Sequence, residues 1–159
     1  NGTDKKKTMI TRDILETELE ELIALYADYT AKENLPPLSK KRIQKIWREV
    51  ERNPGVHYFV LENENRIAAA CILSITPSFI RGGSGYGVIE HVVTHPDFRR
   101  QGFARALMMY TLEFAWDNDC TEVMLLSGND AKPAHKMYRN LGFKDDQRLG
   151  FIMFRQGER

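Results

Sequence analysis

The 159-residue sequence has little cysteine, no excess of charge of either sign and no long apolar run. Its two cysteines, Cys71 and Cys120, lie far apart and form no Cys-x-x-Cys pair. We therefore expect two reduced, buried thiols in a cytoplasmic protein. Lys and Arg number 23 and Asp and Glu 22, so the net charge of +1 gives no electrostatic argument for binding nucleic acid or an anionic membrane. No apolar run reaches the ~18–20 residues of a membrane span, and no apolar signal-peptide segment follows the amino terminus.

Two common phosphate-binding motifs are also missing. The glycine-rich stretch Gly82–Gly85 has neither the G-x-G-x-x-G spacing of a dinucleotide site nor the terminal Lys-Ser/Thr of a P-loop. We expect Pro77–Gly85 to be a flexible connection that borders a substrate site. With 42% hydrophobic and 28% charged residues, the chain has the composition of a globular protein. We expect one domain over residues 9–159, preceded by a polar, disordered or non-native end at residues 1–8.

Hydrophobic periodicity predicts an α/β fold. A strand, a long helix and a following apolar strand form one parallel βαβ crossover, and the rest of the sheet is expected to be antiparallel, with helices flanking it. Thr11 or Asp13 is expected to cap the first helix, and whether Met9–Thr11 adds a further strand stays open. The expected elements are a helix over Asp13–Thr30, a helix after the Ser39 cap, a hairpin of Val56–Leu61 and Arg66–Thr76, a strand over Tyr86–Thr94, a helix over Gln101–Trp116, a strand over Val123–Leu126, a helix from Pro133, and a final hairpin of Phe143 and Gly150–Phe154.

The most informative stretch lies between the Tyr86–Thr94 strand and the long helix. It reads Arg99-Arg100-Gln101-Gly102-Phe103-Ala104. The first amides of a helix have no partner inside the helix, and the helix dipole favours negative charge in front of them. Gly102 allows close approach of the backbone, and the two arginines add charge-assisted hydrogen bonds to phosphate oxygens. The stretch therefore predicts a site for a phosphorylated ligand.

Two stretches together resemble the GCN5-related N-acetyltransferase (GNAT) superfamily. Residues 90–96 with 99–104 resemble its acetyl-CoA motif, and residues 134–143, which end in Tyr138, Leu141 and Gly142-Phe143, resemble its C-terminal motif. The resemblance implies that acetyl-CoA is a co-substrate, with its pyrophosphate on the backbone amides of residues 100–104 beside Arg99 and Arg100. It also implies that the pantetheine arm bonds the strand backbone at Val92 and Thr94, with Val93 between them. The implied cofactor-binding set is Val92, Val93, Thr94, Arg99, Arg100, Gln101, Gly102, Phe103, Ala104, Asn129 and Ala131.

The resemblance further implies direct acetyl transfer to an amine. The amide of Val92 or its neighbour would stabilise the oxyanion. Glu90 is the candidate base, acting through water on an amine that is otherwise protonated, and Tyr138 is the candidate acid for the leaving thiolate. Structural readings of both residues remain open, since Glu90 can face solvent and Tyr138 can simply pack.

One position departs from the family pattern. Many members carry Asn seven residues before the tyrosine, and this chain has Ala131 there. Either Asn129 replaces that contact through a shifted loop, or the contact is absent. His91 and His95 are four residues apart, but we read them as structural and expect no metal site.

The sequence leaves the acceptor and the assembly open. We expect specificity to come from residues 26–45 and 77–85, and Glu33 with Glu90 to attract a cationic amine: a polyamine, an aminoglycoside, an amino-acid derivative or a peptide amine. The alternative function is a non-catalytic acyl-CoA-binding regulatory module on the same fold. We expect no nucleic-acid or membrane partner, and a homodimer is compatible with an exposed sheet end.

Overall fold

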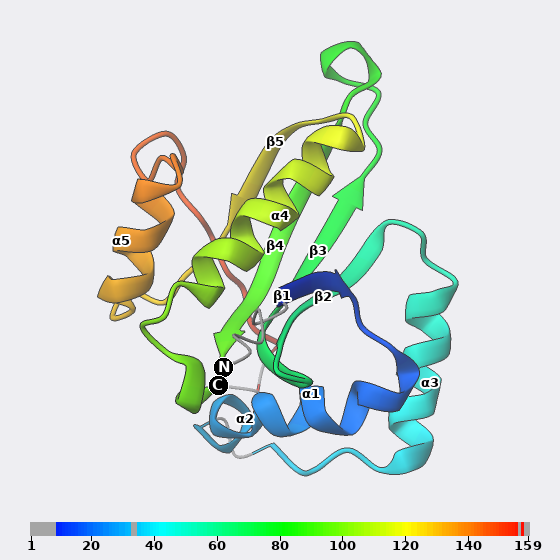
Figure 1. Ribbon diagram of the computed structural model, residues 1–159. Helices are drawn as coiled ribbons and strands as arrows, with labels where there is room; N and C mark the ends of the chain where they lie inside the picture. The colour runs from blue at the N-terminus through cyan, green and yellow to red at the C-terminus, as the bar shows by residue number, and fades with distance from the viewer. Residues whose placement is uncertain (1–8, 33–34, 156, 158–159) are drawn as a thin grey trace, which may run out of the picture. The chain divides into compact units, whose positions relative to one another are not determined.

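The computed structural model describes residues 9–32, 35–155 and 157 (Figure 1). The sequence expectations for residues 1–8 and for Glu33 fall outside these residues. The contacts divide the chain into two units, one ending at Leu125 and the other beginning at Leu126. The elements of the first unit are β1 (Met9–Asp13), a 3-10 turn η1 (Glu16–Glu18), α1 (Leu19–Leu25), α2 (Ala27–Lys32), α3 (Lys40–Glu51), β2 (Val56–Asn63), β3 (Arg66–Thr76), η2 (Arg81–Gly83), β4 (Gly85–Thr94), η3 (Pro96–Phe98), α4 (Phe103–Asp117) and β5 (Cys120–Leu125).

The five strands form one mixed sheet in the order β1-β2-β3-β4-β5. The first three pairings are antiparallel, and β4 pairs with β5 in parallel across the α4 crossover. This confirms the expected α/β class and the βαβ unit. The β2–β3 hairpin turns at Glu64 and Asn65, which both have positive φ, as a tight two-residue hairpin turn requires.

Helix α4 covers one face of the sheet (Figure 1). The ring of Phe59 on β2 meets Tyr110 and Phe114 of α4 at centroid distances of 5.2 and 5.0 Å. Cys71 Sγ on β3 lies 3.4 Å from Thr111 Oγ1, which donates to the Leu107 carbonyl. This face therefore holds an aromatic and aliphatic core with one satisfied polar group.

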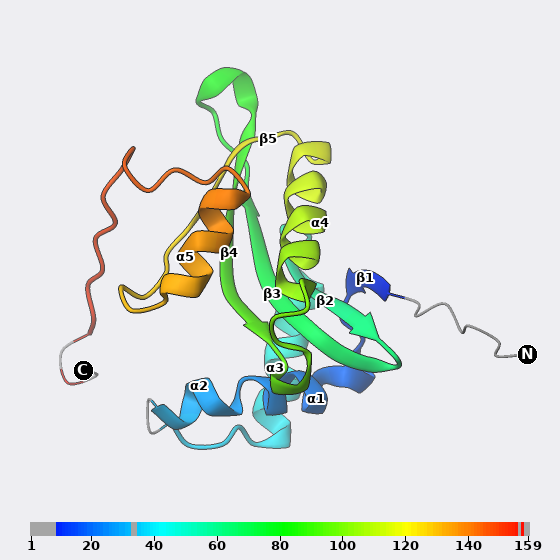
Figure 2. The ribbon, with the colours of Figure 1, turned by 60° about the vertical axis from the view of Figure 1, so that its left-hand side comes forward.

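The opposite face packs against the N-terminal helices. Its buried residues are Ile14, Leu22, Val60, Ile67 and Ala70, with Leu19, Leu25, Tyr26, Trp47, Tyr58 and Val93 packed around them. Figures 1 and 2 both place α1 and α2 beside the carboxyl end of β4. The N-terminal helices thus belong to the same unit as the sheet.

The expected start of the first helix was wrong. The chain is a strand through Asp13, paired with β2, and the helix begins only at Leu19 and stops at Leu25. Arg12 explains the difference, because it donates to Glu18 at 2.6 Å and to Glu62 on β2 at 2.7 Å. Neither expected cap forms at the helix start. The Ser39 cap is confirmed, since its Oγ accepts the Arg42 amide at 3.2 Å.

Two further boundaries moved by a few residues. The long helix starts at Phe103 rather than Gln101, since Gly102 before it has a φ of 86°, a left-handed conformation that ends helical continuity. The apolar strand runs over Cys120–Leu125. Both cysteines are buried, as expected, and neither forms a disulfide in the structure.

The second unit contains α5 (Lys132–Asn140) and an extended C-terminal segment. The expected final hairpin was wrong, because residues 141–155 and 157 contain no strand. Leu149 and Phe151 are 83% and 89% exposed. The second unit as described has no strand with which this segment could pair.

Candidate active site

Strand β4 carries a bulge in its C-terminal half. Pairing shifts by one residue between Ala70 and Ile72 of β3, so that Cys71 stands opposite both His91 and Val92. His91 has a φ of 52°, a conformation uncommon outside glycine and asparagine. Such an extra residue bends the strand and redirects the backbone that follows.

The edge of β4 that faces β5 is open in the second half of the strand. Its parallel pairing with β5 ends at Ile89 and Leu125, while β4 continues to Thr94. In the part of the chain that the structure describes, the first unit has no strand beside β4 on that side past this point. The His95 amide donates to the Ala68 carbonyl on β3 at 2.8 Å. Because antiparallel residues alternate in the neighbour they face, the N–H group of Thr94, beyond the bulge, points away from β3, toward the open edge.

The loop after β4 leads directly to the start of α4. Arg100 and Gly102 have φ values of 59° and 86°, and no side chain among the described residues caps the helix. Gln101 Nε2 donates to the Asp97 carbonyl at 2.9 Å, and Arg99 Nε lies 3.4 Å from the Thr94 carbonyl. The free amides at the helix start, with two exposed arginines, form the arrangement that binds an anion.

Aromatic packing anchors this loop. Phe103 is 7% exposed and Phe98 is 8% exposed, and their rings meet edge to face at 5.5 Å. The Phe103 side chain therefore packs in the core, and only the backbone of Phe103 is available at the start of α4. Ala104 is half-buried in the first turn.

Glu90 lies on the sheet face that carries the N-terminal helices. The register aligns Tyr58, Ile72 and Glu90 in one row across β2, β3 and β4. Glu90 is exposed, one residue before the bulge. Burial, with a smaller contribution from the negative charge of Glu90, raises the pKa of Tyr58. A carboxylate and a protonated phenol thus share this face.

The remaining predicted site residues lie in the second unit. Tyr138 is half-buried on α5, with its ring 5.9 Å from that of Phe143 in an edge-on contact. Ala131 is the N-cap of α5, and its amide bonds the Gly128 carbonyl at 3.0 Å. Asn129 is exposed in the preceding loop. The structure thus gathers Glu90, residues 92–94 and 99–104 within the first unit, and the roles of Tyr138, Asn129 and Ala131 stay predictions.

The sequence matches the model of the acetyltransferase (GNAT) family over residues 18–143. The chain belongs to the GNAT acetyltransferase family. It is 34% identical over 115 residues to a glucosamine 6-phosphate N-acetyltransferase of Trypanosoma brucei brucei, covering 71% of this chain and 76% of that protein.

Solved structures of acetyltransferases share the fold. A putative acetyltransferase from Agrobacterium tumefaciens str. C58 is 27% identical with a TM-score of 0.84, covering 92% of this chain and 99% of that one. A Trypanosoma brucei acetyltransferase is 30% identical with a TM-score of 0.77, covering 92% and 100%. The family match spans both units, and one GNAT domain over residues 9–159 stays a prediction.

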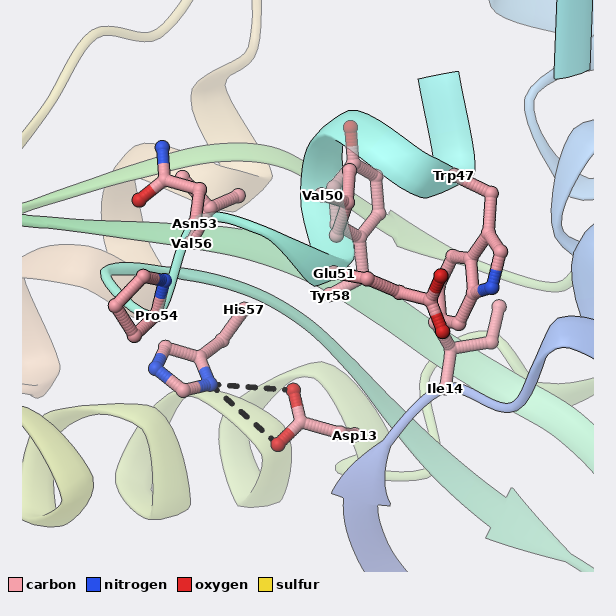
Figure 3. Close-up of a pocket in the computed structure, with 10 residues that line it drawn as sticks. All are labelled: Asp13, Ile14, Trp47, Val50, Glu51, Asn53, Pro54, Val56, His57 and Tyr58. Atoms are coloured by element: carbon pink, nitrogen blue, oxygen red, sulfur yellow. Dashed lines mark hydrogen bonds and ion pairs between the residues drawn. The ribbon is translucent and has the colours of Figure 1, made fainter. Parts of the chain in front are cut away.

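This GNAT acetyltransferase also has a hollow that the sequence analysis missed (Figure 3). It encloses about 220 Å³ between α3 and the first half of β2. His57 Nδ1 lies 3.2 and 3.4 Å from the two Asp13 oxygens, and the carboxylate of Glu51 also lines the space. No local signal links Asp13 to His57, because 44 residues separate them.

The two histidines singled out from the sequence, His91 and His95, lie at the bulge and directly after β4. His95 Nδ1 accepts the Asp97 amide at 3.2 Å, and its Nε2 lies 3.2 Å from Arg66 Nη2. The His91 ring meets the Tyr26 ring at 6.0 Å. Within the described ranges, no three His, Cys, Asp or Glu side chains gather as metal ligands, and no helix is long and apolar enough to cross a bilayer.

Proposed function

We propose that this GNAT acetyltransferase moves the acetyl group of acetyl-CoA to a primary amine of a small molecule at the open edge of β4. The proposal depends on one observation, which is that two structural features lie close together along the chain. The open edge of β4 past its pairing with β5, where the Thr94 N–H faces outward, leads within a few residues to the uncapped start of α4. A ligand with an amide-bearing arm and a diphosphate matches both.

In this proposal the diphosphate binds the amides of residues 100–104, with Arg99 and Arg100 adding charge. Gln101 holds the loop through Asp97, and Phe103 anchors it through Phe98. The pantetheine arm runs along Val92, Val93 and Thr94 as an added strand. Asn129 takes the contact that Ala131 cannot make, because an alanine side chain has no hydrogen-bonding group.

The chemical step is direct transfer. The neutral amine attacks the thioester carbonyl, and the Val92 N–H stabilises the oxyanion that forms. The N–C bond forms and the C–S bond breaks, so that coenzyme A leaves as a thiolate. Glu90 accepts the proton of the amine through water, and Tyr138 gives a proton to the thiolate.

An amino sugar is the first acceptor to test. The support is the Trypanosoma brucei brucei relative, whose name gives glucosamine 6-phosphate as the amine that it acetylates. The other amine classes expected from the sequence stay in the panel. We also propose a cytoplasmic location, supported by the two buried cysteines that form no disulfide, and a homodimer, which light scattering would test.

The test follows thiol release from acetyl-CoA with a panel of amines. Glu90→Gln and Tyr138→Phe should each lower kcat on the order of 10²-fold, the usual contribution of a positioned acid or base. The matched controls are Glu113→Gln and Tyr110→Phe on α4, which should keep the wild-type rate. Acetyl-CoA binding without thiol release on any amine would favour the regulatory alternative, and absence of binding would refute the proposal.

A further inference from the structure

Tyr26 joins the N-terminal helices to the bulge of β4. It is the C-cap residue of α1, between α1 and α2. Its hydroxyl donates to the backbone carbonyl of His91 at 2.9 Å, across 65 positions of sequence. Its ring also meets the His91 ring edge-on at 6.0 Å. Two contacts from one side chain therefore fall on the single β4 residue with positive φ.

The bonded carbonyl belongs to the same peptide unit as the Val92 N–H. A peptide unit is planar and trans, so its C=O and N–H point in opposite directions. A hydrogen bond that holds the His91 oxygen therefore also sets the direction of the Val92 hydrogen. Accepting a hydrogen bond at the oxygen also polarises the unit and strengthens its N–H as a donor.

The backbone of the bulge needs a stabilising contact from outside the sheet. The β3 pairing is interrupted at this point, where Cys71 stands opposite two residues, and β5 has already ended. His91 adopts a conformation that its side chain disfavours. Backbone in such a conformation persists only where its surroundings determine it.

We infer that Tyr26 is a positioning residue, whose hydroxyl fixes the His91–Val92 peptide of the bulge and thereby aims the Val92 N–H at the thioester oxygen. This inference rests on the proposed function, because it gives a catalytic purpose to that N–H. Burial raises the pKa of Tyr26, so the hydroxyl keeps its proton, and the donor, throughout the neutral and mildly alkaline range.

The inference predicts that Tyr26→Phe lowers kcat and leaves the Kd for acetyl-CoA nearly unchanged. Most of the acetyl-CoA contacts proposed above do not involve Tyr26, so the Kd for acetyl-CoA should change less than twofold in Tyr26→Phe. Loss of a whole oxyanion donor costs about 10²–10³ in kcat. A donor that is present but misdirected should lose less, about tenfold. Tyr110→Phe is the matched control, because it removes a hydroxyl from a half-buried ring on α4.

The experiment combines three measurements on wild type, Tyr26→Phe and Tyr110→Phe. Thermal melting establishes the temperature at which all three are folded. Hydrogen exchange of the free proteins should rise in Tyr26→Phe alone at the amides beside the bulge that face β3, such as His95, which donates to the Ala68 carbonyl at 2.8 Å. Steady-state thiol release and acetyl-CoA titration then give kcat and Kd, and the predicted result is a tenfold lower kcat at unchanged Kd in Tyr26→Phe alone.

Two outcomes would overturn the inference in distinguishable ways. A kcat for Tyr26→Phe within twofold of wild type, with an active wild type, would show that the hydroxyl does not position the donor. A wild type that releases no thiol with any amine would refute the proposed function, and the positioning role with it. In that second case exchange at the bulge would still report whether Tyr26 holds the backbone.

Discussion

Replacing Arg100 by Asn tests the proposed diphosphate site with little disturbance of the loop. Arg100 has a φ of 59°, and asparagine is among the few residues that tolerate this conformation. The substitution therefore removes the guanidinium while keeping the backbone. Arg81 in η2 matches it in backbone conformation, with a φ of 57°, and has an exposed side chain that pairs with Glu122 at 2.6 Å. Arg81→Asn therefore controls for the loss of one arginine, and of its ion pair, from a left-handed position.

The expected magnitude follows from the charge-assisted hydrogen bonds that Arg100 would make. Such bonds contribute about 1.5–3 kcal/mol, and about 1.4 kcal/mol corresponds to a factor of ten in affinity. Since Arg100 is exposed, we expect the lower end, a roughly tenfold weaker Kd for acetyl-CoA. Calorimetric titration would measure it, and the difference should shrink as salt rises.

A truncated ligand makes this test specific. Acetylpantetheine carries the thioester and the amide arm but lacks the diphosphate. Its affinity should be the same for wild type and Arg100→Asn, because the lost contact has no partner in the ligand. Equal losses for acetyl-CoA and acetylpantetheine would refute the reasoning, as would a Kd for acetyl-CoA that stays within twofold of wild type.

Two further predictions concern stability and thiol chemistry. Arg12→Met should destabilise the fold by about 2 kcal/mol at pH 7, because it strands Glu18 and Glu62, which are only 19% and 22% exposed. The Arg12 hydrogen bond lowers the pKa of Glu18 from its ordinary value near 4.5, so the difference from wild type should be full above that pH and shrink as the pH falls through the lowered pKa. Urea unfolding at several pH values would measure this loss of unfolding free energy, and a loss that does not depend on pH would contradict the prediction. The control is Lys45→Met, which breaks an exposed ion pair and should cost under about 0.5 kcal/mol. Burial raises the pKa of Cys71 to about 11, so that roughly one thiol in a thousand is ionised at pH 8. A thiol reagent should therefore modify Cys71 only after the protein unfolds. Rapid modification of Cys71 in the native protein would contradict this prediction.

Much of the central region could be predicted from local sequence. The Arg66–Thr76 strand is apolar enough to be assigned from its composition, and its bounds agree with the structure. The Ser39 cap and the parallel βαβ unit also follow from short-range patterns. Gly102 has a left-handed conformation directly before α4, so the glycine in the Arg99–Ala104 stretch correctly indicated an unusual backbone at this point.

The errors and omissions involve contacts between distant residues. Asp13 looked like the start of a helix, but pairing with Phe59 on β2 makes it a strand residue. The bulge at His91 depends on the register between β3 and β4, and no glycine marks it. The ring of Tyr26 packs against the apolar core, as helical periodicity favours, while its hydroxyl bond to His91 could not be inferred from spacing.

The most direct test of the central claim is to quantify both products of one reaction. Wild-type protein is mixed with acetyl-CoA and glucosamine 6-phosphate, and with each other amine of the panel in turn. Free thiol and N-acetylated amine are measured together by colorimetry and mass spectrometry. The account predicts equal amounts of the two with at least one amine, and no thiol release above background without an amine. Thiol release that does not depend on any amine, or that yields no N-acetylated product, would contradict it.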